Sequence, residues 1–387
     1  MSMTHRERVL AALDHRETDR VPVDFGGTIV TTIETGAYGR LKKHLGLDGE
    51  AEKTGDEGML LGAVRLTTLA IPEEPVLRRF DVDTRYLGLG DYEGGGKRAI
   101  DADNFLDEWG TTWSKTGGGH YLFVDGPFYG KKRPTVADLE GHDWPDPSNP
   151  GYYRSLGERA RELRRETDAA IILNLPSGVV LQGLFVRGFG DWHKDLHRNR
   201  DFVGRLSEII ADIWIGLARR ALDVVGDNVD LVFFGDDLAG QEGPLFSPEI
   251  YEELIKPHHE RMIGAVKERG DYKLLFHTCG AAYRFVDHLI DIGVDALNPV
   301  QVSARDMEPG RLKEEFGDRI AFWGGINTQD VLPFGTPEEV RTEVRRMIDC
   351  LGPGGGYVLN SVHNIQKEVP PENIAAMFDE ARTYRAR

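Results

Sequence analysis

Short runs of apolar residues that end in glycine or in a polar residue recur along the chain and predict buried β-strands. The first lies within 19–27, where the sequence reads DRVPVDFGG. These runs lack the alternation of half-exposed strands, so they fit strands that are covered on both faces. Seven more runs of this kind follow, at 84–90, 171–178, 231–237, 273–280, 296–301, 320–325 and 356–361.

Longer segments with one polar and one apolar face separate most of these runs and predict α-helices. Two of them begin with a hydroxyl residue, a proline and a glutamate, at 247–249 and 336–338. That order is typical of a capped helix N-terminus. The predicted helices cover 4–14, 154–167, 200–226, 248–269, 281–292, 306–316 and 337–351.

Eight buried strands that alternate with helices predict a closed (β/α)8 barrel, in which helices surround a parallel sheet. The whole chain, residues 1–387, then forms one domain. The alternative is an open doubly wound sheet. No G-x-G-x-x-G fingerprint follows the first predicted strand, and its absence favours the barrel.

Residues 91–150 do not follow the alternation of strands and helices. The segment is rich in Gly, Asp, Trp and Pro, and it is too long for an ordinary βα loop. Short alternating runs, TTWSK at 111–115 and HYLFV at 120–124, predict small antiparallel hairpins. We interpret the segment as a flap, inserted after the second strand, that covers the mouth of the barrel. The alternative is a surface decoration without a role at the site.

Charge and composition narrow the class of partner. The chain has 47 Lys and Arg residues against 64 Asp and Glu residues, a formal net charge of −17. Such a surface repels nucleic acid and anionic membranes, so neither is expected as a partner. The charged helix at 4–14 lacks the apolar core of a signal peptide, and no stretch approaches the ~20 apolar residues of a membrane span. The two cysteines cannot form a disulfide framework. We expect a cytoplasmic protein that acts on a small molecule.

In a (β/α)8 barrel the active site lies at the carboxyl ends of the strands, so the residues there are the candidates for chemistry. The predicted strand ends supply adjacent carboxylates, two imidazoles, a thiol and several amides, which a barrel built for stability alone does not require. They are Asp24, Asn174, Ser177, Asp236, Asp237, His277, Cys279, Asn298, Gln301, Trp323, Asn327, Asn360, Ser361, His363 and Asn364.

The pair of His277 and Cys279 is the most specific of these features. Residues two apart on a strand point to the same face, so an imidazole and a thiolate converge at the barrel mouth. Nitrogen and sulfur ligands in tetrahedral geometry are typical of zinc, and a catalytic site needs a third protein ligand. His363 or Asp237 can supply it, whereas Cys350 falls on a predicted helix outside the barrel. The alternative is an ordinary buried cysteine.

Asp236 and Asp237 end the fourth predicted strand and point in opposite directions. We expect one of them to face the barrel as an acid, a base or a ligand, and the other to cap the next loop or to bind arginine. Asn298, Gln301 and Asn327 supply neutral hydrogen-bonding groups, either to the reaction or to the backbone of their own loops.

Long stretches of the chain resemble the uroporphyrinogen decarboxylase superfamily, which includes cobalamin-dependent methyltransferases. The resemblance extends over almost the whole chain and implies an enzyme with a (β/α)8 barrel. It rests on RERVLAALDHRETDRVPVDF at 6–25, GDDLAGQEGPLFSPEIYEELIKPHHERMI at 235–263, FHTCGAAYRFVDHLIDIGVDALNPVQ at 276–301, FGDRIAFWGGINTQDVLPFGTPEEV at 316–340 and GPGGGYVLNSVHNIQKEVPPENI at 352–374.

In the methyltransferase branch of this superfamily, an H-x-C pair and a distant cysteine hold zinc. His277 and Cys279 match the pair, and His363 stands at the position of the distant cysteine. The resemblance therefore implies a zinc site and the transfer of a methyl group between a small substrate and a corrinoid. The chain has no D-x-H-x-x-G motif for cobalamin, so the corrinoid is expected on a separate protein.

The remaining candidates receive roles within this interpretation. Asp236 or Asp237 handles protons, with Asn298, Gln301 and Asn327 as further catalytic candidates. The residues expected to bind the cofactor are Asp24, Asn174, Trp323 and Asn360.

The decarboxylase branch gives the second interpretation, a metal-independent lyase that acts on a carboxylated small molecule. His363 fits this branch as well. Its arginine-rich R-Q-A-G-R-Y motif is replaced here by DFGGTIVTTIETGAYGR at 24–40, with Arg40 at the far end, and Asp83 is nearest in position to its aspartate. A substrate with many carboxylates needs cationic partners, so methyl transfer is favoured. A catalytically silent binding protein is a third alternative, and the sequence leaves a homodimer open.

Overall fold

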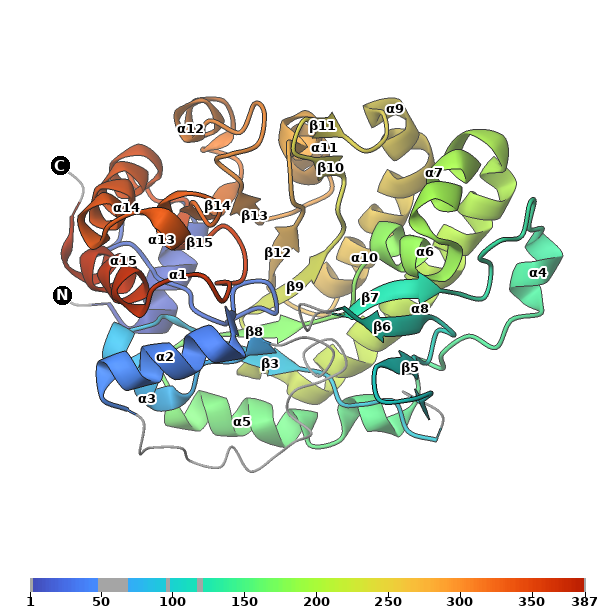
Figure 1. The fold of residues 1–387 in the computed structure, drawn as a ribbon, viewed down its shortest axis with the longest axis horizontal. Helices are drawn as coiled ribbons and strands as arrows, with labels where there is room; N and C mark the ends of the chain where they lie inside the picture. The colour runs from blue at the N-terminus through green and yellow to red at the C-terminus, as the bar shows by residue number, and fades with distance from the viewer. Residues whose placement is uncertain (1–2, 48–68, 95–97, 117–120, 386–387) are drawn as a thin grey trace.

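The computed structural model describes residues 3–47, 69–94, 98–116 and 121–385 (Figure 1). Its largest sheet has seven parallel strands in the order β15-β14-β13-β12-β9-β8-β3. Apart from the first residue of β12, every residue of these strands is buried, as the apolar runs predict. The strands are β3 (Thr84–Gly88), β8 (Ala170–Asn174), β9 (Leu231–Gly235), β12 (Lys273–His277), β13 (Ala296–Val300), β14 (Ala321–Ile326) and β15 (Tyr357–Ser361).

The first predicted strand closes the barrel, although it forms a single bridge rather than a regular strand. Val23 pairs in parallel with Leu359 of β15, and the N–H of Asp24 donates to Leu359 O over 3.0 Å. On the other side, the carbonyl of Val23 accepts from the N–H of Asp83, directly before β3, over 2.9 Å. Pro22 has no N–H to give to a ladder, which keeps the pairing short. The segment joins the two edges of the sheet, and the fold is the predicted (β/α)8 barrel.

Helices surround the barrel (Figure 1). Helix α14 has its predicted bounds, and its cap Thr336 accepts from the N–H of Glu339. The predicted helix 248–269 is divided into α9, one turn of π-helix (η4, Tyr251–Ile255) and α10, because Pro257 cannot donate within a continuous helix. No helix in the described ranges is both long enough and apolar enough to cross a bilayer. The α-helices are α1 (His5–Leu13), α2 (Thr35–Leu45), α3 (Glu74–Phe80), α4 (Val136–Glu140), α5 (Leu156–Glu166), α6 (Val179–Arg187), α7 (Phe189–Arg198), α8 (Arg200–Val225), α9 (Pro248–Ile250), α10 (Lys256–Lys267), α11 (Val286–Asp291), α12 (Pro309–Phe316), α13 (Val331–Phe334), α14 (Pro337–Leu351) and α15 (Pro371–Thr383).

The inserted segment contains a four-stranded antiparallel sheet in the order β4-β5-β6-β7. Its aromatic face packs on Phe185 of α6, with ring centroids 5.0 Å away for Trp113 and 5.1 Å away for Phe123. The sheet therefore lies beside the helix that follows β8. That it acts as a flap over the mouth stays a prediction. The strands are β4 (Arg98–Ala99), β5 (Asn104–Leu106), β6 (Thr112–Lys115) and β7 (Tyr121–Asp125).

Inward-pointing side chains fill the barrel in layers, as the alternation of strand residues requires. The lower layer is apolar and packs on α1, which covers the amino ends of the strands; it includes Ile172, Phe233, Leu275, Trp323 and Val358. Two residues further along the strands, the inward positions become polar or small. They are Asn174, Gly235, His277, Asn298 and Asn360. The change of polarity places the candidate site at the carboxyl ends.

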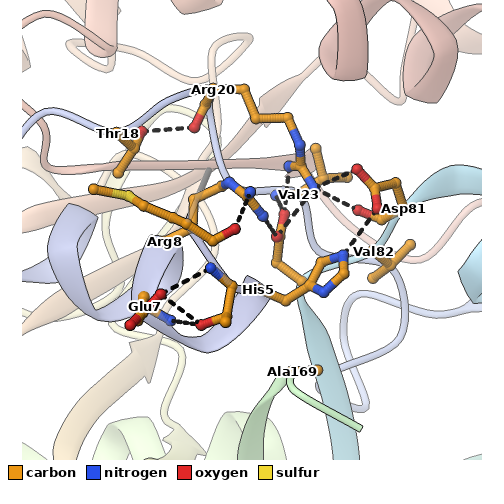
Figure 2. A network of polar contacts seen from close by, with 12 residues as sticks. His5, Glu7, Arg8, Thr18, Arg20, Val23, Asp81, Val82 and Ala169 are labelled. Carbon is orange, nitrogen blue, oxygen red and sulfur yellow. Dashed lines mark hydrogen bonds and ion pairs between the residues drawn. The ribbon is translucent and has the colours of Figure 1, made fainter. Parts of the chain in front are cut away.

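A network of buried ions lies at the opposite end of the barrel (Figure 2). Asp83, directly before β3, accepts from Arg8 Nη1 over 2.5 Å and from Arg20 Nη1 over 2.6 Å. Arg20 also bonds Asp81 over 2.8 Å. Asp83, the nearest candidate for the decarboxylase aspartate, thus holds the N-terminal segment to β3 and lies away from the mouth. These arginines are neutralised within the fold.

Candidate metal centre

Two histidines and a cysteine come together at the carboxyl ends of the strands. His277 is the last residue of β12, Cys279 follows it by two residues, and His363 follows β15 by two residues. One ligand atom of each lies within 4.8 Å of the others. His277 Nε2 is 3.3 Å from Cys279 Sγ, and the two imidazole centroids are 5.6 Å apart. The structure therefore brings together the three residues expected to bind metal; their role as ligands stays a prediction.

The donor set and its spacing fit zinc. Tetrahedral zinc with bonds of about 2.0–2.1 Å to nitrogen and 2.3 Å to sulfur separates two such ligands by about 3.6 Å. The distance between His277 Nε2 and Cys279 Sγ, 3.3 Å, is close to that value. His277 is buried, whereas Cys279 and His363 are half-buried. Three protein ligands leave the fourth tetrahedral position to water or substrate, which matches a catalytic rather than a structural zinc site.

Asn298 fixes which nitrogen of His277 faces the cluster. Asn298 lies on the neighbouring strand β13, and its Oδ1 is 2.6 Å from His277 Nδ1. Its Nδ2 donates to Trp323 O over 3.3 Å, which orients the amide. Oδ1 is therefore the acceptor, so Nδ1 carries the hydrogen and Nε2 presents its lone pair to Cys279. Ligating histidines in metal sites are held in this way.

Burial sets the protonation states of the three residues. It lowers the pKa of His277, and burial together with the adjacent His277 lowers the pKa of His363 to about 3. Burial and the charge of Asp237 raise the pKa of Cys279. Both imidazoles are thus neutral, which is their ligand form, and the thiol must release a proton when a metal binds.

Asp237 lies beside the cluster and faces the mouth. Its Oδ1 accepts from the N–H of Cys279 over 3.0 Å and lies 4.0 Å from His277 Nε2. The side chain is 34% exposed. Asp237 is therefore the carboxylate of the adjacent pair that can reach a substrate.

Asp236 points the other way and is fully buried. Its two oxygens accept from the N–H groups of residues 180 and 181, in the first turn of α6, over 2.9 and 2.7 Å. His259 Nε2 lies 2.8 Å from Oδ2. Asp237 therefore faces the mouth, whereas Asp236 caps the first turn of α6. Asp236 is not placed to handle substrate protons.

Two further catalytic candidates bond backbone. Gln301 Oε1 accepts from the N–H of Gly280 over 2.6 Å and fixes the turn after Cys279. Asn327 Oδ1 accepts from the N–H groups of residues 329 and 330, over 2.8 and 3.1 Å, at the start of α13. Gln301 therefore supports the cluster, while the side chain of Asn327 serves its own loop.

The residues expected to bind a cofactor lie within the barrel. Asp24 accepts from Trp323 Nε1 over 2.9 Å, and Asn174 accepts from Ile29 N and donates to Gly27 O, over 3.1 and 3.0 Å. These contacts fix the chain after the first strand. Asn360 is 1% exposed, and neither polar atom of its amide has a partner in the described part of the chain. Asp24, Trp323 and Asn174 therefore form hydrogen bonds with other parts of the protein.

Sequence reasoning missed His259, which holds Asp236. The signal was present: His259 occupies a core position of α10, on the same buried face as Met262, Ile263 and Val266. A histidine at an apolar position of an amphipathic helix needs a buried partner.

A model of the family described as Uroporphyrinogen decarboxylase (URO-D) matches residues 121–384. The chain belongs to the uroporphyrinogen decarboxylase family. This confirms the superfamily membership that the motifs indicate. The uroporphyrinogen decarboxylase of Alkalilimnicola ehrlichii is 24% identical over 388 residues, which cover 98% of this chain and 94% of that protein. That of Aromatoleum aromaticum is 30% identical over 140 residues, 35% of this chain and 37% of that protein.

Among solved structures, a methyltransferase from Methanosarcina mazei is similar to this chain with a TM-score of 0.66. The alignment covers 98% of this chain and 99% of that one, at 16% sequence identity. At that identity the likeness concerns the fold, and it supports the barrel. Members of the uroporphyrinogen decarboxylase family are enzymes, so the chain has the fold and family of an enzyme.

Proposed function

We propose that this family member is a zinc-assisted methyltransferase, which moves a methyl group between a small substrate and a corrinoid carried on a partner protein. The observation that carries the proposal is the cluster of His277, Cys279 and His363, whose ligand atoms lie within 4.8 Å of one another. A soft N, S, N donor set at the mouth of a barrel suits zinc with an open position. The full-length likeness to a methyltransferase supports the proposal.

Zinc held by these residues would supply Lewis acidity, which favours a thiolate or an activated leaving group at neutral pH. The chain's own residues prepare the site. Asn298 holds His277 with Nε2 toward the cluster. Asp237, half-exposed and 4.0 Å from His277 Nε2, is placed to accept or return a proton at its Oδ1. Gln301 orders the turn that presents Cys279.

The charges around the cluster favour a neutral or cationic substrate. In the described part of the chain, no lysine or arginine bonds His277, Cys279, His363 or Asp237. A carboxylate stands beside the ligands instead. The proposed partners are such a small molecule and a separate corrinoid protein, with neither nucleic acid nor membrane; a homodimer and a cytoplasmic location belong to the same proposal.

The second candidate is a metal-independent decarboxylase, favoured by the names of the curated relatives at 24–30% identity. Such a substrate carries several carboxylates and needs cations to bind them. Arg8 and Arg20 are held by aspartates at the closed end of the barrel. Arg40 donates to the carbonyl of Lys367, in the loop after β15. These contacts favour the methyltransferase over the decarboxylase.

Metal analysis of the purified full-length protein tests the choice. We expect one zinc per chain, lost in Cys279→Ser and kept in Cys350→Ser. Cys350 is the matched control because it is the chain's other cysteine and lies on α14, outside the barrel. The zinc form should demethylate methylcobalamin with a thiol acceptor, which changes the visible spectrum. Metal-free protein that releases carbon dioxide from uroporphyrinogen would refute the proposal.

A further inference from the structure

A buried chain of three polar side chains lies behind the metal centre, between β9 and α10. Tyr251 Oη lies 3.1 Å from His259 Nδ1, and His259 Nε2 lies 2.8 Å from Asp236 Oδ2. All three residues are fully buried. Groups of this kind are costly to bury unless each donor meets an acceptor. None of the three takes part directly in the reaction proposed above, so a different role must explain why they are buried there.

The direction of each hydrogen bond follows from Asp236. A carboxylate only accepts, and it already accepts from the N–H groups of residues 180 and 181 at the start of α6. His259 Nε2 must therefore donate, and in the neutral imidazole this leaves Nδ1 to accept from the Tyr251 hydroxyl. A Cβ at Gly178 would lie 2.4 Å from Asp236 Oδ2, so glycine is needed there for α6 to approach. The orientation of His259 is thus fixed from both sides.

The backbone of Asp236 connects this chain to the cluster. Its N–H donates to His277 O over 2.9 Å. The next residue, Asp237, accepts from the N–H of Cys279 over 3.0 Å and lies 4.0 Å from His277 Nε2. The position of residues 236 and 237 therefore sets where two ligands of the cluster lie relative to each other. His259 holds residue 236 from the side opposite the mouth.

We propose that His259 is a positioning residue of the metal centre. By donating to Asp236 it fixes the end of β9 against His277 and Cys279, and through them it controls metal affinity and ligand geometry. Tyr251 supports it by fixing the hydrogen on Nε2. The inference deepens the proposed function and rests on it for the identity of the metal, whereas the placement of Cys279 is independent of any metal.

Cobalt titration of the metal-free full-length protein tests this inference, because the visible bands of Co²⁺ report coordination geometry apart from activity. We expect His259→Ala to weaken Co²⁺ and Zn²⁺ binding about tenfold, the lower end of the effect of removing a direct hydrogen-bond partner of a ligand, because His259 bonds Asp236 rather than a ligand, and to shift the bands. His259→Gln keeps a donor toward Asp236 and should restore both. His258→Ala is the matched control: within the described part of the chain this adjacent histidine makes no hydrogen bond to Asp236, so its loss should leave binding unchanged.

A second readout needs no metal. In a Cys350→Ser background Cys279 is the single thiol, and His259→Ala should change its alkylation rate severalfold while His258→Ala does not. If His259→Ala fails to fold, Tyr251→Phe removes one hydrogen bond and should show the same changes at smaller size. Unchanged bands, affinity and alkylation in the folded variant overturn the positioning role. If the parent protein binds neither metal, the zinc proposal fails, and the alkylation rates alone decide the role of His259.

Discussion

The protonation states of the cluster predict how zinc affinity depends on pH. Burial lowers the pKa of His277 below its ordinary value and brings that of His363 to about 3, so both imidazoles favour the neutral form at neutral pH. The raised pKa of Cys279 keeps the thiol protonated at neutral pH when no metal is bound. With both imidazoles neutral, zinc displaces one proton, from Cys279.

The size of the effect follows from that single proton. Affinity should fall tenfold, about 1.4 kcal/mol, for each unit that the pH is lowered. Between pH 8 and pH 5 the loss is about 1000-fold. If the two histidines had the ordinary pKa of about 6.5, each would cost a further factor of about 30 at pH 5. The total loss would then be about a million-fold, so the two cases differ by three orders of magnitude.

Competition with a chelator of known affinity at each pH measures the slope, with the Cys350→Ser variant as the control for the second thiol. Calorimetry in two buffers with different ionisation enthalpies counts the protons released, and we expect one. Cys279→Ser should bind weakly, without the same proton release. A slope approaching three below pH 6 would refute the assignment of neutral imidazoles and, with it, the burial of the two histidines.

Three further predictions concern single residues. Asn298→Leu removes the acceptor 2.6 Å from His277 Nδ1 and should weaken zinc binding about 10- to 100-fold; unchanged affinity in chelator competition would show that the tautomer is fixed otherwise. Asp83→Asn leaves buried guanidinium groups without their carboxylate and should cost about 3–5 kcal/mol of unfolding free energy in urea. Asp379→Asn removes the partly exposed ion-pair partner of Arg79 and should cost less than about 1 kcal/mol; equal losses would contradict this. Burial raises the pKa of Asp107 to about 6, so its ionisation destabilises the fold as pH rises from about 4 through 6. The unfolding free energy of Asp107→Asn should rise by about 2.5 kcal/mol relative to that of the parent between pH 4 and pH 8. A difference that stays constant with pH would argue against the raised pKa.

The sequence predicted the cluster because strand geometry is periodic. His277 and Cys279 are two residues apart, so they share a face even if the end of the strand is misplaced by one residue. The same rule could not choose between Asp236 and Asp237, because the choice depends on which residue ends β9, and strand boundaries are the least certain part of a pattern. The decisive feature was α6, whose first turn binds Asp236.

Helix α6 itself was missed for a related reason. Seven of its nine residues are buried, including Gln182 and Arg187, so its sequence has no polar face for an amphipathic pattern to reveal. Helices α2, α3, α7 and α15 were not predicted either. The long amphipathic helices α8 and α14, by contrast, lie where the pattern places them, because one side of each meets water.

A polar residue at a strand end does not by itself indicate a functional site, because its hydrogen bonds can be made within its own loop. A set of metal-ligand side chains brought together is a stronger indication. Asn174 and Asp24 stand at strand ends, yet their oxygens accept from backbone or from neighbouring side chains, as any loop over a barrel requires. His277, Cys279 and His363 differ because their ligand atoms are brought within 4.8 Å of one another. A barrel gains no stability from that arrangement, since the segments after β12 and β15 must both be held in place to produce it. The family assigns the fold, whereas our proposal for the reaction rests on this cluster and on the carboxylate of Asp237 beside it.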